Sequence, residues 1–193
     1  MIANPTKPAY YDRLQKSGNP THAAITFKLD GMKENIIEVK KPSKCSEKEL
    51  EDFEDFVLAG DQVNPNTLNS LIRKAKALVF LKQGGCLKGI AAIKNPNLNY
   101  KNKVFEKAKA TVLASDFMFE LGWVFVLPSA RGKKFSHELV KAALTASDSQ
   151  SVFATSHLTN EKMHHTLKLY GFSCHGHEYS NSSGSKNVLF IRP

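Results

Sequence analysis

The sequence lacks the features of a membrane-spanning or secreted protein. No apolar run approaches the roughly 18 residues that a bilayer-spanning helix needs. Residues 1–14 lack the apolar core of a secretory signal. Cysteine is scarce: Cys45, Cys86 and Cys174 are odd in number and far apart, which argues against a disulfide framework. We therefore expect a cytoplasmic, reduced protein with no membrane partner.

Two kinds of ligand motif are also missing. The sequence has no G-x-x-x-x-G-K-[ST] run, which excludes a Walker A phosphate loop. Cys174 lies close to His175 and His177, but strand alternation puts the cysteine opposite both histidines, and no Cys-x-x-Cys partner exists. His164 and His165 would point about 100° apart on a helix. We expect no metal.

Positive charge is abundant. The 27 Lys and Arg residues outnumber the 18 Asp and Glu residues, which gives a net charge of +9. This excess favours an anionic partner such as a nucleotide cofactor, a nucleic acid or an acidic protein surface; solubility is the alternative explanation. Many of the basic residues are spread through residues 73–109, which is weaker support for nucleic acid than a compact cluster.

The length and the hydrophobic pattern predict one domain after an N-terminal arm. We expect residues 1–34 to form an irregular arm with one short strand near residues 24–29, and residues 35–193 to form the domain, as a monomer or homodimer. The expected strands of the domain are residues 36–39, 77–82, 87–93, 117–127, 151–156, 172–179 and 188–192. The expected helices are residues 46–58, 65–75, 104–110, 132–146 and 160–170.

The most informative run is ELGWVFVLPSARGKKFSHEL, residues 120–139. It predicts a buried strand, a break at Pro128, a basic turn and the start of an amphipathic helix. A helix N-terminus leaves backbone N–H groups unpaired and carries partial positive charge, so it binds phosphate unless something else caps it. Arg131, Lys133 and Lys134 add full positive charges at the same place.

This run resembles the acetyl-CoA loop of the GNAT superfamily of acyl-CoA N-acyltransferases. In that family a strand ending in Val-x-Pro is followed by Arg/Gln-x-x-Gly-x-Gly/Ala, and residues 126–128 and 131–136 match this pattern. Lys134 stands where the family has its first glycine after the Arg, and Ser136 where it has Gly or Ala. A second family signature, a helix that begins with Asn and ends in Gly-Phe, is similar to residues 160–172.

The resemblance implies a fold and a cofactor. The fold is the α/β (α+β) GNAT acyl-CoA N-acyltransferase fold, a mixed, mostly antiparallel sheet of about six to seven strands flanked by helices. The implied activity is N-acetyl transfer from acetyl-CoA, as co-substrate, to a primary amine. The strand edge would pair with the pantetheine arm and the loop would wrap the pyrophosphate. The implied cofactor-binding residues are Phe125, Val126, Arg131, Gly132, Lys133, Lys134, Phe135, Ser136 and Asn160.

Glu120 is the candidate base. Direct attack on a thioester needs a neutral amine, and a carboxylate can take the proton that a charged amine carries. Family members often place a Glu on this strand, and period-two alternation puts Glu120 on the same side as Val126. Asp116 and His157 are weaker candidates, and a salt-bridged strand residue is the alternative interpretation of Glu120.

The candidate acid lies at a different position from the acid of the family pattern. Many family members carry a tyrosine four residues before the Gly of Gly-Phe, where this chain has Leu167. Tyr170 lies three residues further on, roughly 60° around the helix, and is the candidate substitute, with core packing as the alternative. Two other functions stay open: transfer to a nucleic-acid-linked amine, and a non-catalytic acyl-CoA-binding module.

Overall fold

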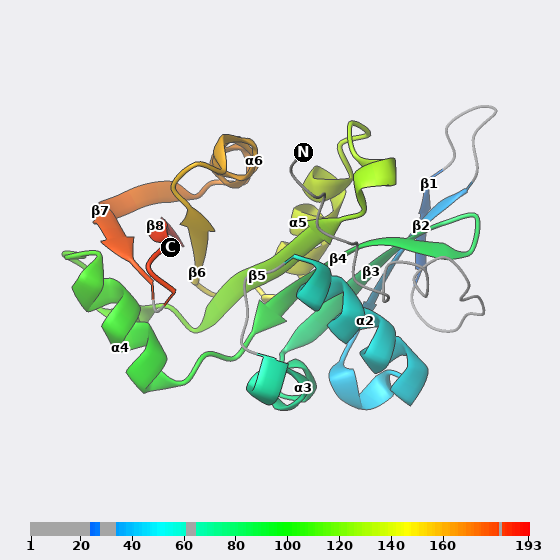
Figure 1. Cartoon of the computed structure of the whole chain (residues 1–193), viewed down its shortest axis with the longest axis horizontal. Coiled ribbons are helices and arrows are strands. Elements are labelled where there is room, and N and C mark those ends of the chain that lie inside the picture. Colours follow the sequence, from blue (N-terminus) through cyan, green and yellow to red (C-terminus); the bar gives the residue numbers. More distant parts are fainter. Residues whose placement is uncertain (1–23, 28–33, 61–64, 182) are drawn as a thin grey trace, which may run out of the picture.

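Helices cover both faces of an eight-stranded sheet (Figure 1). The computed structural model describes residues 24–27, 34–60, 65–181 and 183–193. The strands are β1 (Ala24–Phe27), β2 (Asn35–Lys40), β3 (Ala77–Gln83), β4 (Cys86–Lys94), β5 (Phe119–Val126), β6 (Val152–His157), β7 (Ser173–Ser180) and β8 (Lys186–Arg192). The helices are α2 (Glu47–Ala59), α3 (Pro65–Arg73), α4 (Leu98–Lys107), α5 (Phe135–Thr145) and α6 (Glu161–Leu169), with short 3-10 turns at Pro42–Lys44, Ala114–Asp116 and Pro128–Ala130.

The strand order is β1-β2-β3-β4-β5-β6-β8-β7, and among the described strands β5 and β6 form the only parallel pair. This confirms the mixed, mostly antiparallel sheet. β1 lies within the segment expected as an arm, pairs with β2 and brings the number of strands to eight. The rest of the expected irregular arm falls almost wholly outside the described residues.

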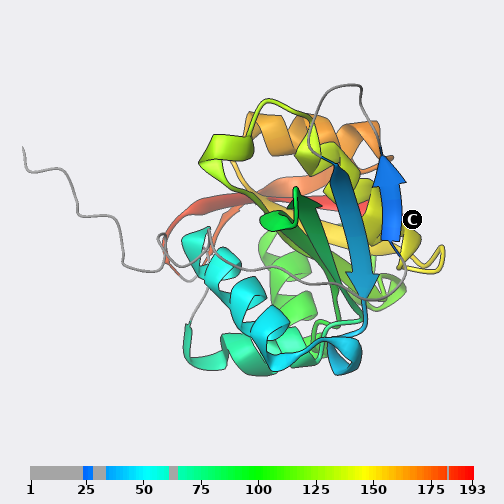
Figure 2. The ribbon, with the colours of Figure 1, turned by 90° about the vertical axis from the view of Figure 1, so that its right-hand side faces the viewer.

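The two faces of the sheet carry different helices. α2 and α3 lie on one side and α5 and α6 on the other (Figure 2). On the first face, the ring of Phe56 in α2 packs against that of Phe125 in β5, 5.9 Å between centroids. On the second face, α5 lies so close to β4 that a Cβ added at Gly89 would be 3.0 Å from Leu139 Cδ1. No helix in the described ranges is long and apolar enough to span a bilayer.

Local capping signals position two helices as expected. The Ser46 side chain accepts a hydrogen bond from the Glu49 N–H while the Glu49 carboxylate accepts one from the Ser46 N–H, so the capping box opens α2. The Asn160 side chain accepts a hydrogen bond from the Met163 N–H at 3.2 Å and opens α6. Gly171, with φ of 84°, follows α6 in the left-handed conformation typical of a helix end.

Two other helices begin elsewhere than expected. α4 begins at Leu98 rather than near residue 104, because the Asn97 side chain accepts a hydrogen bond from the Tyr100 N–H at 2.8 Å and caps the helix. α5 begins at Phe135 rather than near residue 132, because Gly132 (φ 84°) and Lys134 (φ 59°) are both left-handed.

α4 builds a second, smaller core on the face that carries α2. Its Phe105 ring lies 5.4 Å from those of Phe117 and Phe153. Leu189 and Ile191 of β8 complete the same cluster. Helix α4, which follows β4 in sequence, is thereby fixed against β6 and β8 at the far end of the sheet. This packing positions the first turn of α4, and Tyr100 with it, beside β5.

Candidate active site

β5 contains a bulge at its centre. The pairing with β4 shifts between the pairs that contain Gly122 and Phe125, so Trp123 and Val124 lie opposite the single residue Ala91. Trp123 has φ of 51°, a left-handed conformation that is uncommon for a bulky residue. The bulge adds one residue to the strand and therefore reverses the alternation of side chains beyond it.

The bulge corrects the expected position of Glu120 relative to Val126. Glu120 pairs with Lys94 and Val126 pairs with Gly89. Because Lys94 and Gly89 are an odd number of residues apart on β4, their side chains lie on opposite faces. Glu120 therefore faces α2 and α4 while Val126 faces α5, and the period-two argument that put both on one side is wrong.

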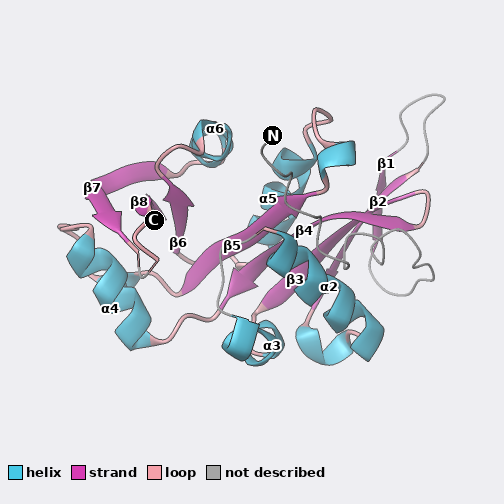
Figure 3. Ribbon diagram, viewed as in Figure 1, coloured by secondary structure: helices cyan, strands magenta, loops and turns pink. Residues whose placement is uncertain are grey.

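β5 and β6 separate halfway along their length (Figure 3). Their pairing covers Phe119–Leu121 and Val152–Ala154 and ends there, while β5 continues to Val126 and β6 to His157. Beyond this point one edge of each strand has no neighbour among the described strands. Ser156 lies on β6 in this separated part; its Oγ is buried and has no hydrogen-bond partner within the described residues. This split is a place where an extended, amide-rich chain can pair with strand edges.

The loop after β5 presents a row of unpaired donors. The backbone N–H groups from Gly132 through Ser136 donate to no acceptor within the described part of the chain. Lys134 precedes α5 and its side chain makes no capping hydrogen bond. The uncapped helix start therefore retains its partial positive charge. An anion of the size of a phosphate fits this chemistry.

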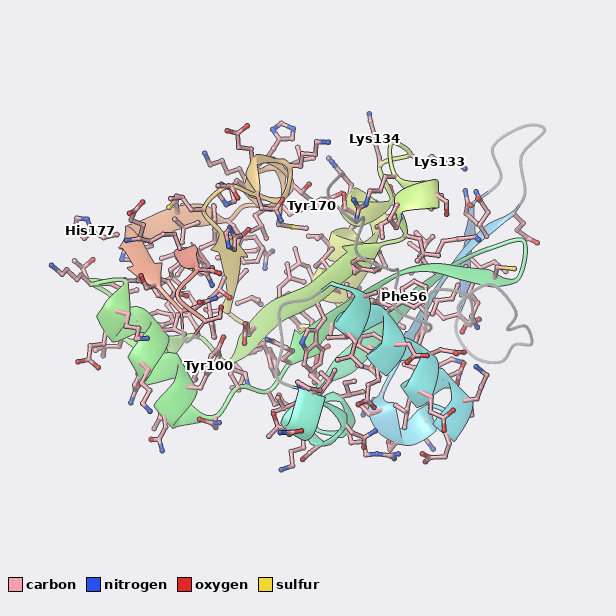
Figure 4. The ribbon with its side chains drawn as sticks, viewed as in Figure 1. Phe56, Tyr100, Lys133, Lys134, Tyr170 and His177 are labelled. Carbon is pink, nitrogen blue, oxygen red and sulfur yellow. The ribbon has the colours of Figure 1, made fainter. Side chains whose placement is uncertain are left out.

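The basic side chains of the loop are held at its two sides. Arg131 Nε donates to the Val126 carbonyl at 3.1 Å, and its guanidinium lies 5.9 Å from the centroid of the Phe125 ring. Lys133 Nζ is 3.4 Å from Gln83 Oε1 in β3. Figure 4 shows Lys133 and Lys134 at the same end of the molecule, far from Tyr100. The expected cofactor-binding residues from 125 to 136 are thus adjacent, and Asn160 lies beyond the end of β6.

Glu120 is buried and paired, with 3% of its surface exposed. Its Oε1 forms an ion pair with Lys94 Nζ at 2.8 Å and accepts a hydrogen bond from the Tyr100 hydroxyl at 3.2 Å. Burial of the Tyr100 hydroxyl, reinforced by the negative charge of Glu120, raises the pKa of Tyr100 far above its usual range. Tyr100 therefore stays a hydrogen-bond donor, although the residue as a whole is 38% exposed.

Lys94, Tyr100 and Trp123 are residues at this site that sequence reasoning missed. Lys94 Nζ lies 5.1 Å from the centroid of the Trp123 ring as well as next to Glu120. Lys94 could have been predicted by pairing β4 with β5, because these strands follow one another in the chain and Lys94 lies opposite Glu120. Tyr100 required the Asn97 cap, and Trp123 required the bulge, which the alternation of side chains does not reveal.

The other candidates lie away from Glu120. Tyr170 packs against His137 of α5, 6.3 Å between ring centroids, on the opposite face of the sheet. Burial, and then the negative charge of Glu138, raises its pKa. Leu167 is part of the main core with 1% of its surface exposed. His157 contacts the Thr159 hydroxyl at 3.2 Å. The structure brings none of these side chains to Glu120.

The histidines of β7 contact the segment that follows α4. His175 Nε2 accepts a hydrogen bond from the Thr111 N–H at 3.3 Å, and the His177 N–H donates to the Ala108 carbonyl at 2.7 Å. Among the described residues, no group of three or more His, Cys, Asp or Glu side chains could hold a metal ion. These contacts attach β7 to the end of α4.

Comparison with known proteins identifies the fold. The sequence matches no family model and no curated protein. Among solved structures, it is similar to an acyl-CoA N-acyltransferase from Pseudomonas aeruginosa, with a TM-score of 0.57 and 14% identity over 81% of this chain and 98% of that one. It is also similar to a GNAT-family acetyltransferase from Bacillus cereus (TM-score 0.53, 18% identity, 80% of this chain and 95% of that one).

A third similar structure was solved with a ligand. It is yncA from Salmonella typhimurium with its cofactor acetyl-CoA, with a TM-score of 0.54 and 13% identity over 81% of this chain and 91% of that one. Identities this low show the fold alone. The chain has the GNAT fold that its two motifs led us to expect.

Proposed function

We propose that this protein is an N-acetyltransferase that moves an acetyl group from acetyl-CoA to a primary amine by direct attack. The observation that carries the proposal is the row of N–H groups from Gly132 through Ser136, which have no acceptor among the residues that the structure describes and which lie beside the split between β5 and β6. A pyrophosphate and an amide-rich arm are two parts of coenzyme A, and each has a matching feature here.

The cofactor would lie along the α5 face and reach the other face through the split. Backbone N–H groups of the loop would hold the pyrophosphate, with Arg131, Lys133 and Lys134 adding charge. The separated end of β5 would pair with the pantetheine amides, and the unpartnered Ser156 hydroxyl supports a polar ligand in the same split. The acyl end would then emerge on the face of the sheet that carries Glu120.

Glu120 would act as the base on that face. Lys94 and Tyr100 both contact Oε1, so Oε2 is the oxygen that would accept a proton from the acceptor ammonium. The free amine would attack the thioester carbonyl carbon, form the new C–N bond and expel the thiolate. Tyr100 is a positioning residue because it acts through Glu120.

The leaving thiolate needs little help. Thiols have a pKa near 8.5, so the thiolate of coenzyme A is a fair leaving group without a dedicated acid. Tyr170 remains the candidate acid, since Leu167 is buried in the core and carries no proton to give. Its hydroxyl would protonate the sulfur from the α5 face, opposite the base.

The charge around Glu120 favours a cationic acceptor over a nucleic-acid-linked amine. Helix α2, on the same face as Glu120, has the sequence EKELEDFEDFVLA and holds six of the 18 carboxylates of the chain. Ion pairs with Arg73, Lys40 and Lys48 offset three of these charges, and the net negative charge of the helix repels a phosphate backbone and attracts an ammonium group. The acceptor itself is unidentified.

A thermal-shift titration with acetyl-CoA, followed by a free-thiol assay with a panel of amines, tests the proposal. We expect the midpoint of unfolding to rise with acetyl-CoA concentration, because a ligand that binds the folded state stabilises it. Thiol release should then depend on an added amine. Stabilisation without thiol release from any amine would favour the non-catalytic acyl-CoA-binding module, and no stabilisation by any acyl-CoA would reject the proposal.

A further inference from the structure

The Glu120 site already contains a primary ammonium, that of Lys94. Lys94 Nζ is 2.8 Å from Glu120 Oε1 and 5.1 Å from the centroid of the Trp123 ring. A carboxylate and an aromatic face are the groups with which proteins hold an alkylammonium ion. The side chain of Lys94 is 20% exposed, so its ammonium is largely enclosed by these neighbours.

Lys94 also lies at the point where β5 and β6 separate. A Cβ added at Gly122 would be 2.9 Å from Lys94 Cε and 3.1 Å from Nζ, so the lysine side chain crosses the glycine backbone. Gly122 directly follows Leu121, the last residue of β5 that pairs with β6. Under the proposed function, the acyl end of the cofactor reaches the Glu120 face at this place.

We infer that Lys94 is an acceptor within its own chain, whose ε-amine the protein acetylates from bound acetyl-CoA. This inference rests on the proposed function, because it uses the same cofactor path and the same base. The Lys94 ammonium gives one proton to Glu120, and the free Nζ attacks the thioester carbonyl carbon. The N–C bond forms and the C–S bond breaks. The thiolate takes the second proton from nitrogen, and Glu120 releases the first to water.

Acetylation of Lys94 removes the positive charge that pairs with Glu120. An acetylated Lys94 is neutral, so it no longer supplies an ammonium to Oε1, and the Tyr100 hydroxyl becomes the remaining donor from the pair. The ammonium of an external acceptor can then approach Glu120 without competition from Lys94. Acetylation of Lys94 would therefore change how the protein treats other amines.

Lys76 provides a matched control in the same chain. Its Nζ is 2.8 Å from Asp148 Oδ2 and 5.6 Å from the centroid of the Phe119 ring, so it too has a carboxylate and an aromatic neighbour. Its side chain is 32% exposed, more than that of Lys94, and it lies on the α5 face of the sheet. Non-enzymatic acetylation should therefore modify Lys76 at least as fast as Lys94.

The experiment incubates the full chain with acetyl-CoA that carries a deuterated acetyl group and follows each lysine by mass spectrometry. We expect Lys94 to be labelled at least about tenfold faster than Lys76, with a first-order rate that does not change with protein concentration. Glu120→Gln should slow labelling of Lys94 by about 100-fold or more, which is the contribution of a general base. Lys94→Arg keeps a cation opposite Glu120 and should remove the label at this position.

Three results would overturn the inference. Equal labelling of Lys94 and Lys76 would mean a non-enzymatic reaction, and this comparison needs no variant that has to fold. An unlabelled Lys94 in protein that binds acetyl-CoA and acetylates added amines would reject Lys94 as acceptor and leave the proposed function intact. If acetyl-CoA does not raise the midpoint of unfolding, both the inference and the proposed function fail.

Discussion

The two ends of β5 differ in the chemical groups that they offer to a substrate. At the loop that follows β5, the binding groups are backbone N–H groups, which have no acceptor among the described residues, and exposed basic side chains. At the other end of the strand, Glu120 is buried and shares one carboxylate oxygen between Lys94 and Tyr100. The first end is built to attract an anion, and the second to hold one carboxylate in a fixed direction.

The difference has a physical origin in the strand itself. The bulge at Trp123 turns Val126 toward α5 and leaves Glu120 facing α2 and α4. A ligand that contacts both ends must pass from one face of the sheet to the other. The split between β5 and β6 begins at Gly122, next to the bulge, and offers that passage. Changes at the two ends should therefore affect different steps.

The largest effect should come from Glu120→Gln. Without a base on the acceptor side, we expect kcat to fall by about 100- to 10,000-fold while the Kd for acetyl-CoA stays within about twofold. Glu38→Gln is the matched control, since Glu38 is also buried and paired with a lysine, Lys82 Nζ at 2.9 Å. Steady-state kinetics and calorimetric titration measure the two quantities. An unchanged kcat and pH–rate profile would remove Glu120 from the mechanism.

Arg131→Ala should weaken the binding of acetyl-CoA and change kcat far less. Loss of one charge at the phosphate end should raise the Kd for acetyl-CoA about tenfold, or about 1.4 kcal/mol, with kcat at saturation changed far less. The effect should shrink as ionic strength rises, because Arg131 is exposed and its charge is screened. Arg73→Ala makes the same change of net charge on α3 and should leave the Kd unaltered. Equal losses from both variants would mean that only the overall charge matters.

How well the sequence predicts each end of β5 depends on whether the contacts there join residues that are close together in the chain or far apart. The loop is contiguous in sequence, so residues 126–136 could be found from a strand, a proline and a basic turn. Glu120 and Tyr100 are 20 residues apart, and their contact depends on where α4 begins. Tyr100 lies in the first turn of a helix that begins at Leu98 after the Asn97 cap, whereas the sequence predicted a helix from residue 104.

Most of the fold could be predicted from the sequence because the helices and strands carry local signals at their boundaries. The capping box at Ser46, the hairpin between β3 and β4 and the glycine after α6 each specify a boundary by themselves. The bulge at Trp123 has no such signal, because a left-handed tryptophan is held by packing around it. Phe53 makes one such contact, 6.1 Å between the ring centroids. Contacts between distant residues decide the face on which Glu120 lies.

Tyr100→Phe should give a smaller effect on the acceptor side. The substitution removes the hydroxyl that donates to Glu120 Oε1 but leaves the ring and the Lys94 ion pair. The loss of one hydrogen bond to a charged group, in a site that keeps its ion pair, should lower kcat about three- to tenfold. The KM for acetyl-CoA should not move. A rise in that KM with constant kcat would show that Tyr100 belongs to the cofactor side instead.

The smallest expected effect is on the cofactor side and concerns stability. Lys134 occupies a left-handed conformation, φ 59° and ψ 19°, which costs a non-glycine residue about 1–2 kcal/mol. Lys134→Gly relieves that cost but adds freedom to the unfolded chain, which offsets about 0.4–1 kcal/mol of the gain. We expect a net increase of about 0.5 kcal/mol in the free energy of unfolding, seen as a rise of about 1–2 °C in Tm.

Two further substitutions separate the backbone from the charge at this position. Lys134→Ala removes the same charge and keeps the strain, so it should give no rise in Tm, while Lys134→Asn should give part of the gain because Asn tolerates the left-handed region. If Ala and Gly raised Tm equally, relief of repulsion among Arg131, Lys133 and Lys134 would explain the gain. Repulsion among these three positive charges would then destabilise the loop, and a bound phosphate would reduce that repulsion.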